Sequence, residues 1–243
     1  MKRFKVPVID SFGEQAILIR WEVGIQTEFL YELLRIKAFL TRSFQETEVL
    51  NTYDALLLKY ASPIQDFKEE KGRILQRLRE VPEEPIHQVT CHTLPVCYHP
   101  SLGWDLEEVS RRKAMHTQEL IQKHTAPLYT VYFQGFLPGF LYLGGLDPAL
   151  TVARKGKPRL KVDKGAVGLA EHQTGIYPQH SAGGWQIIGN CPVPLFSVDQ
   201  NPPSAFSAGD KLKFTAVSLS EYQALKAAVR TGSFTWKSEP YFI

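Results

Sequence analysis

Glycine and proline interrupt the second half of this chain so often that no long helix can form there. From residue 127 to about residue 215 they separate short runs whose side chains favour extended structure. The clearest runs are Tyr129–Phe133, Gly165–Ala170, Trp185–Gly189 and Lys211–Thr215. Many short strands between turn residues are typical of a β-barrel or β-sandwich. We therefore expect a barrel or sandwich in this half of the chain.

The first ninety residues follow a different pattern, in which short apolar runs alternate with helical spacing. Apolar residues recur every three or four positions from Glu28 to Phe44, with Thr27 as the expected N-cap, and again from Ile64 to Leu78. Extended runs are expected at 16–19, 49–60 and 86–96. The order strand, helix, strand, helix, strand predicts a small α+β sandwich, ferredoxin-like in outline.

These two patterns predict two domains, an α+β domain at 1–90 and a β-rich domain at 91–243, separated within the proline-containing region 82–95. The β-rich half also has helical segments. Residues 105–124 read as one or two helices, with Thr117 as an internal N-cap. Ser218 and Glu221 have the spacing of a capping box, and Gly232 suits the position that follows the end of that helix.

Composition excludes several classes of protein. The chain has 243 residues, of which 44% are hydrophobic and 22% charged, so extended disorder is not expected. A net charge of +3 does not indicate a nucleic-acid binder. Three cysteines at irregular spacing and the absence of a signal-peptide pattern suit the reducing cytoplasm. Residues 125–146 carry no charge, but their prolines and glycines argue against a transmembrane helix.

Common catalytic motifs are absent from the sequence. It has no phosphate-binding P-loop, no dinucleotide-binding glycine motif, no nucleophile elbow and no HExxH zinc motif. Cys91, His92, Cys97 and His99 lie close together, but neighbouring residues of a strand point to opposite faces. We therefore expect a strand that enters a loop here, and no metal site.

The strongest candidate for a binding site is a basic stretch at 154–164, which has six basic residues and one acid. Arginines and lysines beside glycine and proline turns can hold a carboxylate or phosphate. Arg159 is the best candidate, because Pro158 restricts the backbone before it. Two other interpretations remain open: a solvated loop or lysine-guarded edge strand, and an Arg159 that only pairs with a carboxylate of its own chain.

Neutral hydrogen-bonding residues gather near the next turns. Gln173, Thr174, Tyr177 and Ser181 lie around glycines and suit the orientation of a small polar substrate. His124 ends a predicted helix, where a structural role at the helix terminus is the main alternative to acid–base chemistry.

Several long segments together resemble one family. These are HTAPLY from His124, GFLPGFLYLGGLDP from Gly135, and then PRLKV, GAVGLA, QTGIYP, GGWQIIG and AGD. They resemble the family of the 5-oxoprolinase B subunit, also called KipI-like or allophanate hydrolase subunit 1. The match covers roughly residues 90 to 225.

The resemblance implies an N-terminal α+β domain followed by a cyclophilin-like β-barrel. It implies that the chain acts with a C subunit (KipA-like) and an A subunit in ATP-dependent opening of 5-oxoproline to glutamate, and is inactive alone. ATP with Mg²⁺ would be shared with the partner, because the chain has no P-loop. On this reading Arg159, Gln173, Thr174, Tyr177 and Ser181 bind substrate, and His124 is an acid–base candidate.

Two other functions remain open at this point. One branch of the family inhibits a sensor histidine kinase, which would require an exposed apolar surface on the barrel. A prolyl isomerase would rest on fold analogy alone.

Departures from the family pattern bear on activity. Asn190 stands where the family usually has arginine, Glu171 where it has glycine, and Asp163 where it has proline. Loss of the arginine would either weaken an anion site or be neutral.

Overall fold

The computed structural model describes residues 6–84 and 86–243, which form two compact units that divide between His87 and Gln88. Unit 1 contains one antiparallel sheet with the strand order β1-β2-β4-β3. Its strands are β1 (Val8–Ser11), β2 (Ala16–Arg20), β3 (Thr47–Asn51) and β4 (Ala55–Tyr60), and its helices are α1 (Thr27–Ser43) and α2 (Phe67–Arg79).

The amphipathic spacing of α1 explains its packing in unit 1. Its buried positions recur every three or four residues, so they form one apolar face. They are Phe29, Leu30, Leu33, Ile36 and Leu40. That face packs with strand residues such as Ile17, Ile19 and Leu56 in one hydrophobic core. The expected N-cap at Thr27 is wrong, because the helix is preceded by Gln26, whose side chain makes no capping hydrogen bond.

The ferredoxin-like outline of unit 1 is not confirmed. The expected strand at 49–60 is a hairpin of two strands, β3 and β4, joined by a short turn. The expected strand at 86–96 belongs to unit 2, and an unexpected strand, β1, forms the sheet edge beside β2. Of the four residues of β1 only Val8 and Ile9 are apolar, so the apolar run is too short to predict a strand.

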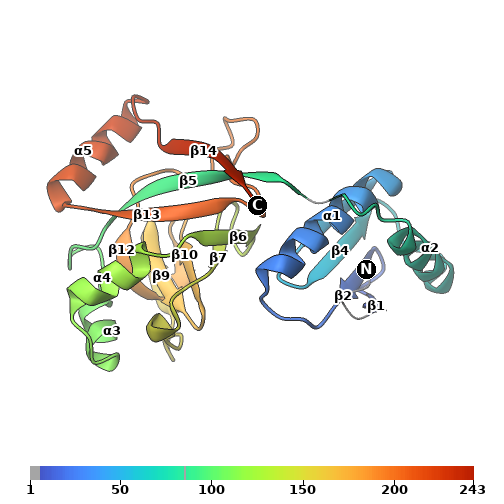
Figure 1. The fold of residues 1–243 in the computed structure, drawn as a ribbon, viewed down its shortest axis with the longest axis horizontal. Coiled ribbons are helices and arrows are strands. Elements are labelled where there is room, and N and C mark those ends of the chain that lie inside the picture. Colours follow the sequence, from blue (N-terminus) through green and yellow to red (C-terminus); the bar gives the residue numbers. More distant parts are fainter. Residues whose placement is uncertain (1–5, 85) are drawn as a thin grey trace. The chain divides into compact units, whose positions relative to one another are not determined.

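Unit 2 is built around a closed barrel of seven strands in the order β12-β9-β10-β7-β6-β13-β5, with β12 pairing back to β5 (Figure 1). These strands are β5 (Gln88–Cys97), β6 (Tyr129–Gln134), β7 (Leu141–Gly144), β9 (Ala166–Ala170), β10 (Gln173–Ile176), β12 (Gln186–Asn190) and β13 (Lys211–Val217). Of the barrel and the sandwich that the spacing of turns predicted, the structure therefore shows the barrel.

The remaining elements of unit 2 surround the barrel. Strand β14 (Lys237–Phe242) extends the sheet beyond β5, and β8 (Arg159–Val162) pairs with β11 (Ser181–Gly183) in a separate two-stranded ribbon. The helices are α3 (Leu106–Arg112), α4 (Thr117–Thr125), the short 3₁₀ helix η1 (Pro148–Leu150) and α5 (Leu219–Arg230). Figure 1 shows β13 between β5 and β6 along one side of the barrel.

Two of the three expected helix-end signals in unit 2 are confirmed. Ser218 and Glu221 form a reciprocal capping box at the start of α5, and Gly232 has a φ of 72° just after its end. Thr117 is not an N-cap, because α4 begins at this residue and is preceded by His116.

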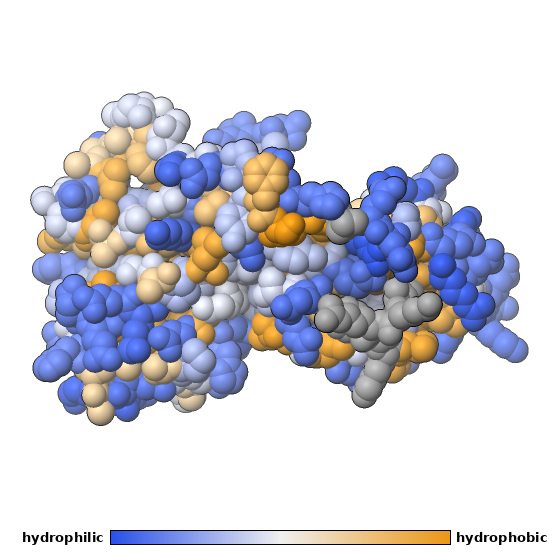
Figure 2. Space-filling model, in the orientation of Figure 1, coloured by the Kyte–Doolittle hydropathy of each residue, from blue (hydrophilic) through white to orange (hydrophobic). Residues whose placement is uncertain are grey.

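Alternation along the strands divides the hydrophobic residues of unit 2 between two cores. Val167 and Leu169 of β9 join the larger core, whereas Ala166 and Ala170 face a second cluster that contains Phe140, Tyr177 and Trp185. On the face shown in Figure 2, hydrophobic residues form separate patches among hydrophilic ones.

Candidate functional site

A buried carboxylate, Asp105, organises the basic stretch. Its side chain is 4% exposed and accepts two hydrogen bonds from the Arg159 guanidinium, at 2.6 and 2.8 Å. Lys155 Nζ donates to the same carboxylate at 2.8 Å, and so does the backbone N–H of Ile187, at 2.7 Å. Burial by itself would raise the pKa of Asp105, but these hydrogen bonds outweigh it and leave the pKa lowered.

The carboxylate joins three elements that are far apart in the sequence. Asp105 precedes α3, Arg159 begins β8, and Ile187 lies in β12. The Arg159 guanidinium also stands 5.4 Å from the centre of the Trp104 ring. Lys155 reaches Gln186 Oε1 at 3.4 Å, and Gln186 in turn donates to the carbonyl of Ala153. Of the interpretations of Arg159 that the sequence left open, the structure therefore shows pairing with a carboxylate of its own chain.

Tyr177 lies beside this network, under the ribbon of β8 and β11. Gly183 pairs with Arg159 in the ribbon, and a Cβ on Gly183 would lie 2.3 Å from the Tyr177 hydroxyl oxygen. A side chain larger than hydrogen is therefore excluded at Gly183. The Tyr177 ring is 1% exposed and packs edge to face on Phe140. Burial raises the pKa of Tyr177.

Thr174 and His124 lie in the larger core of the barrel unit. His124 Nδ1 is 2.7 Å from the Tyr98 hydroxyl and its Nε2 is 2.9 Å from Thr174 Oγ1. Because Thr174 donates its proton to the Gly168 carbonyl, it must accept from His124 Nε2–H. Tyr98 then donates to Nδ1, so the imidazole is neutral.

Complete burial lowers the pKa of His124 to about 3. Its ring also stacks on Phe214, with centroids 4.9 Å apart. The geometry gives no support to the expected acid–base role of His124, because both ring nitrogens are bound inside the core and the residue is 0% exposed. The same burial keeps Thr174 from a substrate at the surface.

The two remaining candidates are half-buried. Gln173 begins β10 opposite Ala170, and Ser181 begins β11 opposite Val162, with its hydroxyl bonded to the Ala182 carbonyl. The structure thus brings Arg159, Tyr177 and Ser181 to one ribbon. Gln173 lies on the outer side of the barrel wall with Gly175, because alternate residues of a strand share a face.

Sequence reasoning missed Asp105, Lys155 and Gln186. In the sequence, Asp105 begins a predicted helical segment, Lys155 is one of six basic residues at 154–164 among which Arg159 is the favoured candidate, and Gln186 lies within an apolar run. A buried acid cannot be recognised from its neighbours in sequence when its partners are 50 and 54 positions away.

The three residues that depart from the family pattern lie in different structural settings. Asn190 is 4% exposed, donates to the Lys164 carbonyl and accepts from the Tyr222 hydroxyl of α5. Asp163 lies 3.3 Å from His180, with both side chains largely exposed. Glu171 has a φ of 51°, a conformation that glycine adopts more easily.

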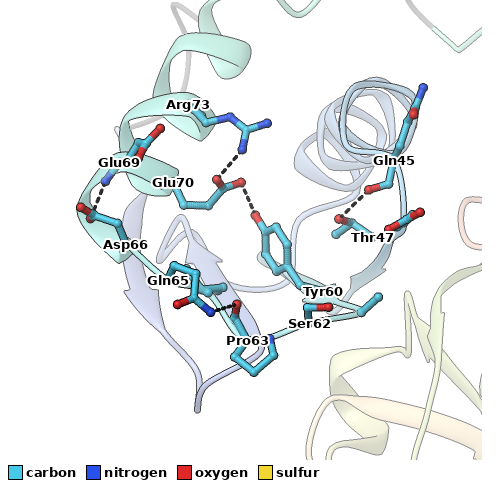
Figure 3. Close-up of a pocket in the computed structure, with 13 residues that line it drawn as sticks. Gln45, Thr47, Tyr60, Ser62, Pro63, Gln65, Asp66, Glu69, Glu70 and Arg73 are labelled. Carbon is cyan, nitrogen blue, oxygen red and sulfur yellow. Dashed lines mark hydrogen bonds and ion pairs between the residues drawn. The ribbon is translucent and has the colours of Figure 1, made fainter.

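A polar cavity of about 340 Å³ lies in unit 1, between the ends of β3 and β4 and the start of α2 (Figure 3). At its centre the buried carboxylate of Glu70 accepts a hydrogen bond from the Tyr60 hydroxyl at 2.9 Å and forms an ion pair with Arg73 at 2.7 Å. The hydrogen bond from Tyr60 ties β4 to α2, whereas the ion pair lies within α2. Four of the residues that line the cavity are acidic and one is basic: Glu46, Asp66, Glu69, Glu70 and Arg73.

Metal-binding clusters and membrane-spanning helices are both absent from the described part of the chain. In 6–84 and 86–243 no group of three or more His, Cys, Asp or Glu is placed to hold a metal ion. No helix in the same residues is both long enough and apolar enough to cross a bilayer. The side chains of the Cys91–His99 segment are otherwise engaged, since His92 lies 3.4 Å from Asp210 and the two cysteines are buried.

Comparison with known proteins gives the chain a family. Residues 7–206 match the family model described as carboxyltransferase domain, subdomain C and D. The chain is 38% identical over 179 residues to the 5-oxoprolinase B subunit of Bacillus subtilis, a match that covers 74% of this chain and 73% of the relative. It is 45% identical over 121 residues to the 5-oxoprolinase B subunit of Haemophilus influenzae, covering 50% of this chain and 57% of that protein.

A solved structure supports the fold across nearly the whole chain. The urea amidolyase of Kluyveromyces lactis superposes with a TM-score of 0.83 over 98% of this chain at 16% identity, but this chain covers only 16% of that larger protein. At this identity the likeness concerns the fold alone. With a family model over residues 7–206 and 38% identity to a relative over most of both proteins, this chain belongs to the family of the 5-oxoprolinase B subunit.

Proposed function

We propose that this chain is the B subunit of an ATP-dependent 5-oxoprolinase and acts with the A and C subunits to open 5-oxoproline to glutamate. The observation that carries the proposal is the 38% identity over 179 residues to a protein named as a 5-oxoprolinase B subunit. The names of the relatives concern 5-oxoprolinase, so inhibition of a histidine kinase is not favoured.

The chemistry of the reaction suits a shared site. A lactam is an unstrained amide, so its hydrolysis benefits from activation coupled to ATP. An activated amide oxygen is stabilised by cationic and neutral donors held in fixed positions. ATP with Mg²⁺ is expected to bind with help from a partner, because the chain has no P-loop.

The test is an assay of 5-oxoproline-dependent ATP hydrolysis with this chain alone, and then with the A and C subunits. The proposal expects turnover only in the reconstituted mixture, and no turnover when this chain is omitted. Equal turnover with and without this chain would refute the assigned role. Robust turnover by the single chain would refute the need for partners.

A further inference from the structure

One leucine of the two-stranded ribbon formed by β8 and β11 lies almost entirely in solvent. Leu160 of β8 is 93% exposed, more than any other large hydrophobic side chain in residues 6–84 and 86–243. Exposed apolar residues occur singly on most protein surfaces, so the setting of Leu160 decides whether it has a role. Three features of that setting, a bulge, a rigid support and a ring of unpaired charges, point to a binding surface.

A β-bulge brings Leu160 to the outside of the ribbon together with its neighbour. Between two pairs of the ladder, β8 has two residues, Leu160 and Lys161, where β11 has one, Ala182. Neighbouring residues of a regular strand point to opposite faces, but a bulge turns the strand locally and redirects a side chain. All three side chains are exposed. The bulge therefore presents an apolar and a cationic side chain to solvent together.

The strand that carries Leu160 is anchored at both of its ends. At the start of β8, the Arg159 guanidinium makes two hydrogen bonds to Asp105, at 2.6 and 2.8 Å. At its end, Val162 is 0% exposed and belongs to the core cluster that contains Tyr177. A side chain on a rigid support loses less conformational freedom on binding than one on a flexible loop. Leu160 is therefore held ready to contact another surface.

Three exposed lysines lie close to Leu160: Lys157, Lys161 and Lys164. Their ammonium groups make no ion pair or hydrogen bond within the described part of the chain. Because a chain spans at most about 3.6 Å per residue, their Cα atoms lie within about 11, 4 and 14 Å of the Leu160 Cα. A standard protein interface buries about 800 Å² on each partner, a patch about 30 Å across. The leucine and the three lysines therefore fit inside one interface.

The other charged groups of this stretch are already paired. Lys155 and Arg159 are bound to Asp105, and Asp163, the one acid at 154–164, lies 3.3 Å from His180. An apolar centre surrounded by unpaired cations is complemented by an apolar pocket with aspartates or glutamates on its rim. A nucleic acid would contact the lysines but gain little from the leucine, so a protein surface fits both features better.

We propose that the bulged ribbon at 157–164, with Ala182 opposite the bulge, binds a protein partner whose surface carries an apolar pocket rimmed by acidic side chains. Leu160 fills the pocket, and the three lysines pair with the rim. Within the proposed function, on which this identification of the partner rests, the partner is one of the two other subunits of the 5-oxoprolinase. Arg159 then acts as a positioning residue that holds the ribbon in place through Asp105.

The first experiment measures binding of the purified chain to the immobilised A subunit and to the immobilised C subunit by biolayer interferometry. Leu160→Ser is expected to raise the Kd for the subunit that binds by at least about tenfold, mainly through faster dissociation. The matched control is Val198→Ser, which removes another apolar side chain of unit 2 that is 81% exposed, and it should leave the Kd unchanged. An unchanged Kd for Leu160→Ser would overturn the proposal. An equal rise in both variants would also overturn it, and so would a wild type that binds neither subunit.

The second experiment tests the charges. Lys161→Glu should slow association several-fold at low salt and less at high salt, because rim charges act mainly on the association rate. The control is Lys213→Glu, which reverses an exposed lysine of β13 and should leave the rate unchanged. Equal slowing in the two variants would contradict the proposed rim. The wild type is also tested against duplex DNA and against vesicles that contain phosphatidylserine. Binding to either of these, weakened by Lys161→Glu but not by Leu160→Ser, would assign the lysines to a polyanion and overturn the proposal.

Hydrogen exchange followed by mass spectrometry separates the surface from the proposed function, because it needs no turnover. Backbone amides at 157–164 should exchange more slowly in the complex with the partner subunit than in the single chain. Such protection in a complex without 5-oxoproline-dependent ATP hydrolysis would support the surface and refute the proposed function. Normal turnover with no protection at 157–164 would overturn the surface and leave the proposed function standing.

Discussion

At the scale of single residues, the partner of a side chain decides what its charge can do. Arg159 and Lys155 share the buried carboxylate of Asp105, whereas Arg154 lies on an aromatic ring and has no such partner among the residues described. His124 shows the same principle for a neutral group, because its two nitrogens are both bound in the core. Residue type alone therefore does not show which of these side chains is available to bind a ligand or to transfer a proton.

Glu171→Gly should stabilise the protein by about 0.5–1 kcal/mol, because a left-handed conformation costs about 1–2 kcal/mol in a residue with a Cβ and glycine recovers part of it. Glu171 has a φ of 51° and an exposed side chain. Urea denaturation measures the change. The control is Glu171→Ala, which removes the carboxylate but keeps the Cβ; an equal gain in this variant would show that backbone strain is not the cause.

Lowering the pH should reduce the free energy of unfolding, because His124 is buried as the neutral imidazole. Its pKa is lowered to about 3 in the folded protein, so below about pH 6.5 the unfolded chain binds a proton that the folded chain does not. The contribution of neutral His124 to the free energy of unfolding is complete above about pH 6.5 and is lost progressively as the pH falls towards about 3. From pH 7 to pH 5 the free energy of unfolding should fall by about 2 kcal/mol on this account.

The measurement is urea denaturation at a series of pH values for the wild type and His124→Gln. The variant should be less stable at pH 7, because Tyr98 and Thr174 lose a hydrogen-bonding partner in the core. Its stability should depend less on pH between 7 and 5. Parallel curves for the two proteins would contradict the assignment to His124.

At the scale of elements, Asp105 joins the start of α3 to β8 and β12. Asp105→Ala leaves two cations with side chains 25% and 26% exposed without their carboxylate. Because breaking a buried pair leaves charge uncompensated, we expect a loss of about 3 kcal/mol in the free energy of unfolding. Asp105→Asn should cost less, since its amide oxygen can still accept from Ile187. Chemical denaturation compares the two variants, and equal losses would show that the retained amide oxygen contributes nothing and that the lost charge carries the whole effect.

Arg159→Lys tests the ion pair between Arg159 and Asp105 by changing the cation. Lysine cannot reproduce the two parallel hydrogen bonds of 2.6 and 2.8 Å to Asp105, so this variant should lower stability more than Lys157→Gln does. Thermal unfolding gives the comparison. If Arg159→Lys folds as stably as the wild type and still loses activity in the reconstituted complex, Arg159 contacts the substrate directly.

At the scale of the whole molecule, the chain consists of two compact units, 1–87 with residue 243, and 88–242. Helix α2 ends at Arg79 and β5 begins at Gln88, and Glu83 and Glu84 between them are exposed. A glutamate-specific protease should therefore cut first in this segment and release the barrel unit as a stable fragment. Mass spectrometry of a time course identifies the cut, and early cleavage within the barrel strands would count against two independent domains.

Local patterns in the sequence determined much of the secondary structure. The helical spacing of 28–44, the capping box at Ser218 and the β-prone runs all correspond to observed elements, because side-chain periodicity and turn chemistry act between near neighbours. The long segments shared with one family were also readable and led to the family that the comparisons show.

Only the tertiary structure decided how these elements combine into a site. The barrel closes through the pair Asn190–Cys97, and Asp105 meets Ile187 across 82 positions of sequence. The order of strands in unit 1, the burial of His124 and the neutralisation of Arg159 likewise follow from contacts between distant segments. Burial and charge pairing depend on which segments meet in space, and no local pattern records that meeting.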